Sequence, residues 1–181
     1  MWNHKRRLID QYESFLKSYD ELHFEEQRNK YLAALIEVPL TSEDSIVDFG
    51  CGTGMFTRHV SKHVGKAVGV DLSRKQLLWA KHRSSVVCSY VQADLERPPF
   101  KDNVFDYVFS FTVLHHVKEL SLIIRILTSL AKKGVVVTFL KSLEAAKNLK
   151  SLMEGFKDFK IIDSELLKDV IILVDVAKKG E

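Results

Sequence analysis

The stretch from Ser45 to Thr57 constrains the fold of this chain more than any other. It reads S-I-V-D-F-G-C-G-T-G-M-F-T, a short apolar run with one acid, followed by three glycines at every second position. A strand, a glycine turn and a helix in this order form the unit that binds nucleotides in α/β proteins. Glycine suits such a turn because it adopts positive φ at little steric cost and lets a ligand approach the backbone.

The spacing of the glycines distinguishes between classes of nucleotide site. The dinucleotide fingerprint is G-x-G-x-x-G, and counted from Gly50 its third glycine falls at position 55, which is Met55. A P-loop is excluded because no Gly-Lys-Ser or Gly-Lys-Thr follows the glycines. The chain instead has G-x-G-x-G, formed by Gly50, Gly52 and Gly54, with Asp48 two residues before it. Taken alone, this motif leaves a glycine turn without a ligand as the alternative.

The bulk properties favour a single globular domain. The chain has 181 residues, of which 46% are hydrophobic and 28% are charged, as is ordinary for globular proteins. The net charge of +3 leaves nucleic acid open as a partner but does not indicate it. Cys51 and Cys88 have the spacing of neither a metal site nor a disulfide framework, so we expect a reducing cytoplasm. The amino terminus lacks the apolar segment of a signal peptide, and no apolar run is long enough to cross a membrane.

Residues 1–40 are expected to form a helical extension or lid that precedes the ligand-binding domain of residues 41–181. Apolar residues at three- and four-residue steps predict the buried face of a first helix, formed by Leu8, Tyr12, Phe15, Leu16 and Tyr19. A break is expected at residues 19–22, and a second helix from Glu25 to Ile36. Because the apolar face needs a surface, we expect residues 1–30 to form a lid over the carboxyl edge of the sheet. Permanent packing on an outer face is the alternative.

Strand and helix patterns alternate after the glycine turn. The predicted helices are 55–63, 74–82, 120–130 with a C-terminal end at Lys132-Lys133-Gly134, and 143–154. The predicted strands after the first are 67–72, 89–93, 105–111, 135–140, 159–163 and 170–176. This alternation predicts a mostly parallel, three-layer α/β domain. The last two strands are separated by only a few residues, which favours antiparallel pairing.

Three acids lie at or near the carboxyl ends of three successive predicted strands. Asp48 lies in the first strand, Asp71 ends the second and Asp94 follows the third. In a doubly wound sheet, the carboxyl ends of the strands line one crevice, where ligands bind. Asp71 lies 21 residues after Gly50, the spacing of an acid that accepts hydrogen bonds from ribose hydroxyls. Ordinary surface carboxylates are the alternative for Asp71 and Asp94.

These features resemble motif I of the class I S-adenosylmethionine-dependent methyltransferases, an acid followed by x-G-x-G-x-G. The stretch from Asp94 to Ser110 is similar to the D-x-x-x-x-P-F-x-D-x-x-F-D-x-V pattern of the ubiquinone/menaquinone-type (type 11) members. The resemblance covers roughly residues 40–178. It implies a Rossmann-like, three-layer α/β fold with a seven-stranded, mostly parallel sheet in the order 3-2-1-4-5-7-6 and one antiparallel strand.

The resemblance also implies roles toward the cofactor S-adenosyl-L-methionine. It implies that Asp71 binds the ribose and that Asp94 binds the adenine amino group. Asp48 and the backbone of the glycine turn bind the methionine end. Two residues, Leu72 and Ala93, flank the adenine ring. The other cofactor-binding residues that the resemblance implies are Gly50, Cys51, Gly52, Gly54 and Phe111.

The residues at the end of the fourth predicted strand argue against two classes of methyl acceptor. The segment Ser110-Phe111-Thr112-Val113 lacks the two prolines typical of amino methyltransferases that act on adenine or glutamine, and no cysteine follows it, as cytosine-C5 enzymes require. Methyl transfer from a sulfonium is an in-line displacement, so the protein mainly positions the acceptor. His115 and His116 are candidates for a general base, although they equally fit a junction that merely packs. They form no metal site because no third ligand lies at a recognisable spacing.

The sequence thus predicts a single-domain S-adenosylmethionine-dependent methyltransferase with an unidentified acceptor. A small molecule is favoured because few residues lie outside the core fold, and RNA or protein stays open. A non-catalytic protein of the same fold, which binds the cofactor or a partner, is the alternative. A nicotinamide dehydrogenase is disfavoured by Met55. No pattern in the sequence indicates an oligomeric state.

Overall fold

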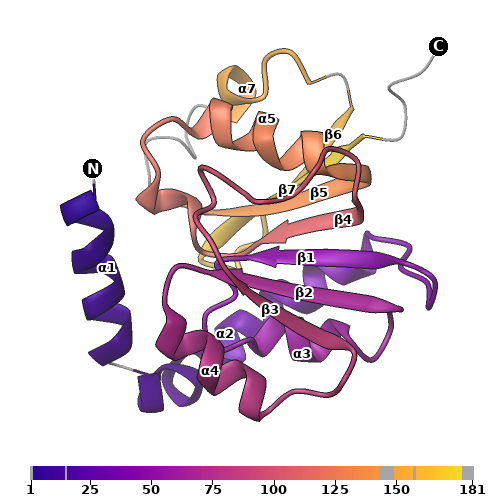
Figure 1. The fold of residues 1–181 in the computed structure, drawn as a ribbon. Helices are drawn as coiled ribbons and strands as arrows, with labels where there is room; N and C mark the ends of the chain where they lie inside the picture. Colours follow the sequence, from indigo (N-terminus) through magenta and orange to yellow (C-terminus); the bar gives the residue numbers. More distant parts are fainter. Residues whose placement is uncertain (1, 15, 143–148, 157, 177–181) are drawn as a thin grey trace.

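A computed structural model describes residues 2–14, 16–142, 149–156 and 158–176. The helices are α1 (Trp2–Ser14), α2 (Leu16–Ile36), α3 (Met55–Val60), α4 (Arg74–His82), the 3-10 helix η1 (Leu114–His116), α5 (Leu120–Leu130) and α7 (Leu149–Leu152). The strands are β1 (Ser45–Phe49), β2 (Lys66–Asp71), β3 (Cys88–Gln92), β4 (Phe105–Ser110), β5 (Ala131–Leu140), β6 (Phe159–Ile162) and β7 (Asp169–Asp175). Figure 1 shows these elements around one central sheet.

The seven strands form one sheet in the order β3-β2-β1-β4-β5-β7-β6. Strand β7 runs antiparallel to both of its neighbours, β5 and β6, and the pairs between β3 and β5 are all parallel. The predicted three-layer α/β fold, its strand order and its single antiparallel strand are therefore confirmed. The order places β1 and β4 side by side at the point where the chain reverses direction across the sheet, which is where doubly wound folds bind ligands.

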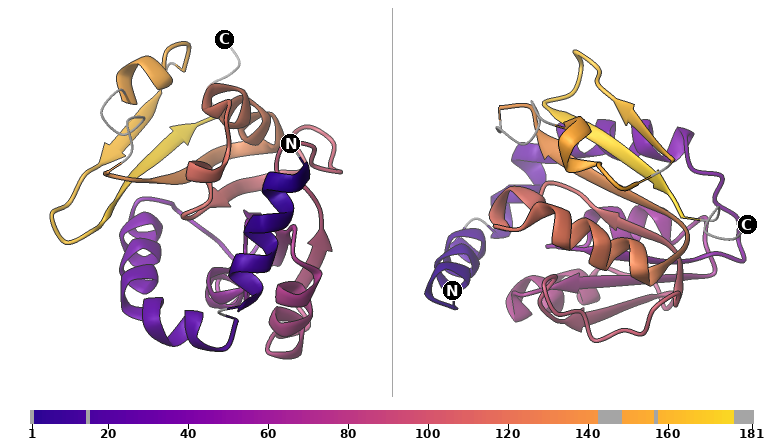
Figure 2. Two further views of the ribbon diagram at one scale, coloured as in Figure 1. Left: turned by 90° about the vertical axis from the view of Figure 1, so that its left-hand side faces the viewer. Right: turned by 90° about the horizontal axis from the view of Figure 1, so that it is seen from above.

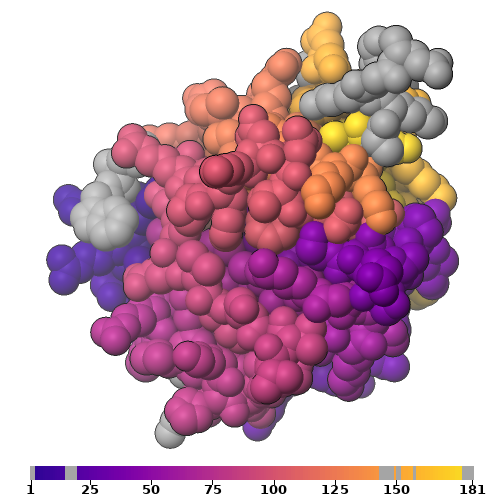
Figure 3. All heavy atoms as spheres, turned by 45° about the vertical axis from the view of Figure 1, so that its right-hand side comes forward, coloured from indigo at the N-terminus to yellow at the C-terminus, as the bar shows by residue number. Residues whose placement is uncertain are grey.

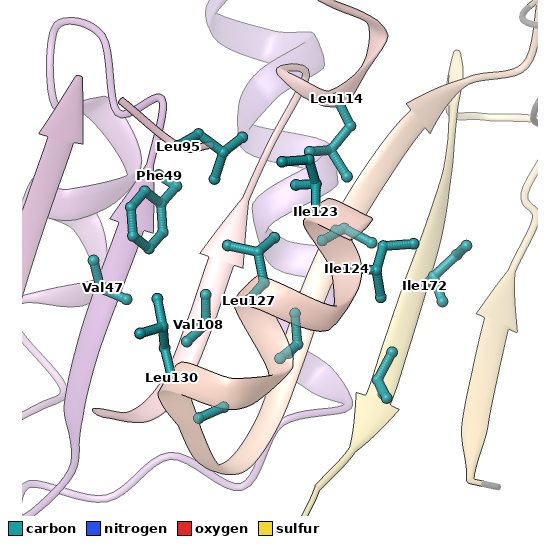
Figure 4. Close-up of a cluster of buried hydrophobic side chains, with 14 of the residues drawn as sticks. Val47, Phe49, Leu95, Val108, Leu114, Ile123, Ile124, Leu127, Leu130 and Ile172 are labelled. Carbon is teal, nitrogen blue, oxygen red and sulfur yellow. The ribbon is translucent and has the colours of Figure 1, made fainter. Parts of the chain in front are cut away.

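Two apolar layers cover the faces of the sheet. On one face, α5 packs against β4 and β5, and its side chains meet those of β1 and the β3–β4 loop in the cluster shown in Figure 4. On the other face, α3 packs against β1 and β2, and α2 packs against α3 and β7, with Ala34, Phe56 and Ile46 among the buried residues. Each of the large apolar side chains buried in this way stabilises the fold by ~1.5–3 kcal/mol. Both faces of β1 are thus buried, as its apolar run predicts.

Two local predictions are wrong. Helix α2 continues through residues 19–22, where a break was expected, because its buried face from Gln27 to Ala34 packs against the sheet and fixes the whole helix. The segment Lys132–Gly134 does not close a helix but belongs to β5, where Gly134 pairs with Tyr107 on one side and Asp175 on the other. Sheet pairing on both sides has overridden the local helix-ending pattern.

Other boundaries differ less. Helix α3 ends at Val60, before the expected residue 63. The predicted helix over 143–154 lies partly outside the described residues, and its described part contains α7. None of the helices in the described part of the chain has both the length and the apolar character needed to cross a membrane.

Helix α1 lies at the carboxyl edge of the sheet, on the side toward which the arrows of β1 and β4 point (Figure 1). The left view of Figure 2 shows α1 running across this edge, in front of the strands. In the space-filling view of Figure 3, α1 appears only at one rim, and the middle of the chain forms most of the visible face. The amino-terminal helix is therefore placed to cover whatever binds at the strand ends.

Candidate functional site

The glycine turn between β1 and α3 has a backbone that only glycine adopts readily. Gly50, Gly52 and Gly54 have φ of 72°, 53° and 75°, all in the left-handed region. A Cβ at Gly50 would lie 2.2 Å from a methyl of Val113, so any side chain there would collide with the loop after β4. Gly50 and Gly52 line a cavity at the carboxyl edge of the sheet, and Gly54 forms the N-cap of α3 behind it.

Asp71, at the end of β2, lines the same cavity and holds the turn in place. Its carboxylate accepts hydrogen bonds from the backbone N–H of Gly52 (2.9 Å) and of Ser73 (2.8 Å). Burial raises the pKa of Asp71, and these two hydrogen bonds oppose that rise. The acid at the end of the second strand is thus at the cavity wall, where a hydroxyl group of a ligand would meet it.

Asp48 lies beneath the turn and is not among the residues that line the cavity. Its buried carboxyl accepts a hydrogen bond from the Thr57 hydroxyl of α3 (2.7 Å). Burial raises the pKa of Asp48 to about 7, the Thr57 bond opposes the rise, and the nearby Asp71 charge adds to it. Asp48 therefore ties β1 to α3 and supports the turn from below.

The third-strand side of the cavity contains Leu72, Ala93 and Asp94. Asp94 is already engaged, because Lys5 of α1 lies 2.6 Å from its carboxylate and 2.9 Å from that of Glu96. Burial lowers the pKa of Lys5, but the two acids outweigh this effect and the net result is a raised pKa. The first helix is thus bound by charge to the end of the third strand.

The fourth-strand side contains Phe111 and Thr112, which also line the cavity. Thr112 has φ of 57°, which is strained for a β-branched residue and costs ~1–3 kcal/mol. Its hydroxyl is 2.8 Å from the ammonium of Lys30 and 3.4 Å from the amide of Gln27. Lys30 also lies 3.0 Å from Asp169, and both of these side chains are fully buried. This buried network holds Thr112 at the cavity wall.

Of the two histidines, only His116 lines the cavity. Its Nε2 lies 2.9 Å from the hydroxyl of Tyr12 on α1. Burial, together with electrostatic repulsion from His115 and His4, lowers the pKa of His116 to about 4. Burial also lowers the pKa of His115. With a pKa of about 4, His116 is neutral near pH 7, and it is the imidazole that faces the cavity.

Several lining residues have no clear signature in the sequence. Lys5 reaches the cavity only because α1 crosses the sheet edge, and Gln76 does so from the first turn of α4. A helical apolar stripe indicated that residues 1–19 need a partner surface, but no local pattern marks Lys5. Its acidic partner Asp94 lies 89 residues away in the chain, a separation that periodicity does not report.

The cavity lining includes one cysteine, Cys51. Cys51 lines the cavity as a free thiol, and its burial raises its pKa well above the usual range, so it is not a nucleophile there. In the residues that the structure describes, no group of three or more His, Cys, Asp or Glu side chains is arranged to hold a metal ion.

Comparisons with known proteins agree with this geometry. The family model of the methyltransferase domain matches residues 47–139. The malonyl-[acyl-carrier protein] O-methyltransferase of Buchnera aphidicola is 35% identical over 95 residues, which are 52% of this chain and 38% of that protein. The demethylmenaquinone methyltransferase of Staphylococcus saprophyticus is 27% identical over 147 residues, 76% of this chain and 63% of that protein. The chain spans less than two thirds of the length of either relative.

Solved structures share the fold at low sequence identity. One is a chain from a complex between the Haloferax volcanii Trm112 methyltransferase activator and a candidate methyltransferase. It has a TM-score of 0.76 and 13% identity, covering 95% of this chain and 98% of that one. Magnesium protoporphyrin IX methyltransferase from Synechocystis, solved with S-adenosylmethionine bound, has a TM-score of 0.66 and 18% identity, covering 89% and 83%. At these identities the likeness concerns the fold.

Proposed function

This chain belongs to the methyltransferase domain family, and from that membership we propose that it transfers a methyl group from S-adenosylmethionine to a small-molecule acceptor. One observation carries the proposal. A single cavity at the carboxyl edge joins the left-handed glycine turn, two strand-end acids and the polar groups of the first helix and the fourth-strand loop. S-adenosylmethionine is the cofactor of the structural neighbours and fits this donor and acceptor set.

The residues around the cavity suit the parts of the cofactor. We propose that Asp71 accepts hydrogen bonds from the ribose hydroxyls, and that Asp94 serves the adenine amino group while it stays paired with Lys5. The absence of side chains at Gly50 and Gly52 leaves backbone exposed for the methionine part. Asp48 acts on the cofactor through the turn that it supports, since it does not line the cavity.

The bound cofactor supplies an electrophilic methyl group, so the chain mainly has to orient the acceptor and exclude water. Orientation of this kind contributes up to ~7–11 kcal/mol to lowering a barrier. Where the acceptor must lose a proton, His116 is the best-placed group, because it faces the cavity as a neutral imidazole hydrogen-bonded to Tyr12. His115 does not line the cavity, and we propose for it only a packing role.

The lining favours a small acceptor with an apolar body. Leu8 and Ile9 of α1, together with Val113 and Val117 beside η1, give the cavity an apolar wall, and Gln27 adds an amide. The named relatives act on malonyl-[acyl-carrier protein] and on demethylmenaquinone, and the second of these is a small apolar molecule. A cytoplasmic setting fits the two free cysteines.

Titration calorimetry with S-adenosylmethionine, S-adenosylhomocysteine and NAD tests the cofactor. We expect binding of the first two and none of NAD; tight NAD binding without sulfonium binding would refute the assignment. A labelled-methyl transfer assay against cell extract separated into small molecules, RNA and protein then tests the acceptor. Label in the small-molecule fraction is expected, whereas cofactor binding with no transfer in any fraction favours a non-catalytic role.

A further inference from the structure

A second hollow, which adjoins the cofactor cavity, is lined by basic side chains from three helical segments. Arg28 comes from α2, Arg58 and His59 from α3, Lys62 from the turn after α3, and Arg83 from the end of α4. No aspartate or glutamate is among the described residues that line it. We call this set of five residues the basic hollow. Convergence of cations without acids is the electrostatic setting of an anion site.

The charges of the basic hollow are only partly neutralised by the surrounding protein. Asp20 lies 3.2 Å from Arg83 and 3.9 Å from Arg58, so one carboxylate serves two guanidinium groups. Within the described ranges, no ion pair is formed by Arg28 or Lys62. The charges of Arg28 and Lys62 therefore face the hollow without a paired carboxylate.

The partly buried imidazole of His59 reports this excess of positive charge. Its pKa is lowered first by burial, and then by the positive charges of His63, Lys62 and Arg28. Arg28 of α2 and Lys62 of the turn after α3 thus both act on His59, as does His63 of the same turn. A bound anion would offset these charges and raise the His59 pKa, because it favours the protonated imidazole.

The basic hollow adjoins the proposed methyl-transfer site. Tyr31 and Met55 line both the hollow and the cofactor cavity, so the two spaces meet at these side chains. We propose that the basic hollow binds a phosphate group carried by the methyl acceptor, whose remainder reaches past Tyr31 and Met55 into the cavity. The identification of the ligand as the methyl acceptor rests on the proposed methyltransferase function. The binding of an anion in the hollow does not depend on that function.

The arrangement favours a small phosphorylated molecule over nucleic acid. The cations converge on one hollow from α2, α3 and α4, whereas a nucleic-acid backbone is typically followed by a groove or stripe of positive charge. The hydroxyls of Ser61 and Ser85 also line the hollow and offer neutral donors to phosphate oxygens. Guanidinium groups match phosphate oxygens in a bidentate manner, which gives such a site its specificity.

Proton NMR titration of the His59 ring, identified by its loss in His59→Asn, tests the site with pyrophosphate as the probe. We expect pyrophosphate to raise the His59 pKa in the wild-type chain. The double variant Arg28→Ala/Lys62→Ala should weaken pyrophosphate binding by roughly tenfold or more, because it removes two charge-assisted contacts. Both side chains are exposed, so the fold should persist, and S-adenosylhomocysteine binding should stay unchanged.

A matched variant, Lys101→Ala/Lys132→Ala, removes two charges from elements that do not line the hollow and should leave pyrophosphate binding intact. The proposal is overturned if pyrophosphate leaves the His59 pKa unchanged, or if both double variants respond alike. It is also overturned if a single-stranded oligonucleotide shifts the His59 pKa and pyrophosphate does not, since that result assigns the hollow to nucleic acid. A chain that binds pyrophosphate but not S-adenosylhomocysteine refutes the proposed function and leaves the anion site standing.

Discussion

Asp48 is a buried carboxyl group that accepts hydrogen bonds from the hydroxyl and the backbone N–H of Thr57. Its pKa of about 7 lies above the ordinary value of 3.8, so the unfolded chain ionises before the folded one does. The stability linked to the protonated form is therefore fully present below pH ~4 and is lost as the pH rises through about 7. The charge of Asp71 nearby strengthens this trend.

Asp48→Asn should remove this pH dependence. Because one pKa unit corresponds to 1.36 kcal/mol, the variant should gain ~1–3 kcal/mol of stability relative to the wild-type chain between pH 5 and pH 8. Urea unfolding at both pH values measures the difference. Asp106→Asn is the control. Because the pKa of Asp106 is lowered, this carboxyl does not titrate between pH 5 and pH 8, and the stability of the variant should follow the same pH dependence as that of the wild-type chain. Parallel pH profiles for wild type and Asp48→Asn would contradict the burial argument.

Asp71 has two duties, because its carboxylate holds Gly52 and Ser73 and also faces the cavity. Asp71→Ala should weaken S-adenosylhomocysteine binding by ~1–3 kcal/mol, roughly 5- to 150-fold, through unpaired polar groups. Asp71→Asn keeps one acceptor oxygen and should lose less. Calorimetry compares both with Asp102→Ala, an exposed acid in a turn. Wild-type affinity in a folded Asp71→Ala protein would exclude the ribose role.

The strand-end acids show what a sequence reveals about single residues. Asp71 and Asp94 reach the cavity as their positions predict, because parallel strands bring their carboxyl ends to one edge. Asp48 lies in the same motif but points below the turn, since side chains alternate between the faces of a strand. The pairing of Asp94 with Lys5 depends on a helix 89 residues earlier, and no local pattern contains it.

At the scale of elements, α1 is joined to the domain by a few polar contacts. Lys5 pairs with Asp94 (2.6 Å), Tyr12 lies 2.9 Å from His116, and the Ser73 hydroxyl donates to Glu13 (2.6 Å). Partly exposed contacts of this kind contribute only ~0–1 kcal/mol each. In contrast, α2 is anchored by fully buried residues such as Lys30 and Ala34. Any lid should therefore comprise α1 rather than all of residues 1–30.

Hydrogen exchange should show α1 becoming more protected when S-adenosylhomocysteine binds, because the ligand adds contacts across the cavity that α1 covers. Amides of residues 2–14 should gain protection, and those of β1 should not change. Lys5→Ala should lower protection of α1 in the ligand-free chain, whereas Arg7→Ala, at an exposed position, should not. Equal protection of α1 with and without ligand would make it a permanent structural extension.

The elements that sequence predicts poorly are those that tertiary contacts decide. The polar segment at residues 19–22 reads as a break, yet α2 runs through it because the packing of its second half fixes the helix axis. Lys132–Gly134 carries a helix-ending pattern, but strands on both sides recruit it into β5. Helices and strands with strong periodicity, such as α5 and β1, match their predictions because local pattern and packing agree.

Across the whole molecule, the strand order followed from the family that the motifs resemble, whereas alternation and connection lengths predicted a mostly parallel sheet with an antiparallel pair. The ion pair that connects the amino-terminal helices to the last strand could not be predicted in this way. Lys30 of α2 and Asp169 of β7 lie 139 positions apart and meet as a fully buried pair, 3.0 Å between charged atoms. A second carboxylate, Glu26, lies 3.2 Å from Lys30 and is less buried. This pair connects the amino-terminal helices to the last strand and to Thr112 at the cavity.

Lys30→Met should destabilise the chain by ~3–5 kcal/mol, because it leaves the Asp169 carboxylate buried without a cation. Within the described residues, Oδ1 of Asp169 lacks a hydrogen-bond partner, and Oδ2 keeps a bond from the Thr112 hydroxyl (3.3 Å) that supplies no counter-charge. Urea unfolding measures the loss. Lys160→Met, which breaks the exposed pair with Glu37, should cost no more than ~1 kcal/mol.

The double variant Lys30→Met/Asp169→Asn separates the cost of an unpaired charge from the cost of lost packing. It should recover much of the stability lost in Lys30→Met, since no buried charge remains. A double variant as unstable as Lys30→Met would instead assign the loss to packing around α2. Because Lys30 also holds Thr112 in its strained conformation, the double variant should fold but bind the acceptor poorly. Wild-type transfer rates in that variant would show that the network stabilises the fold without shaping the site.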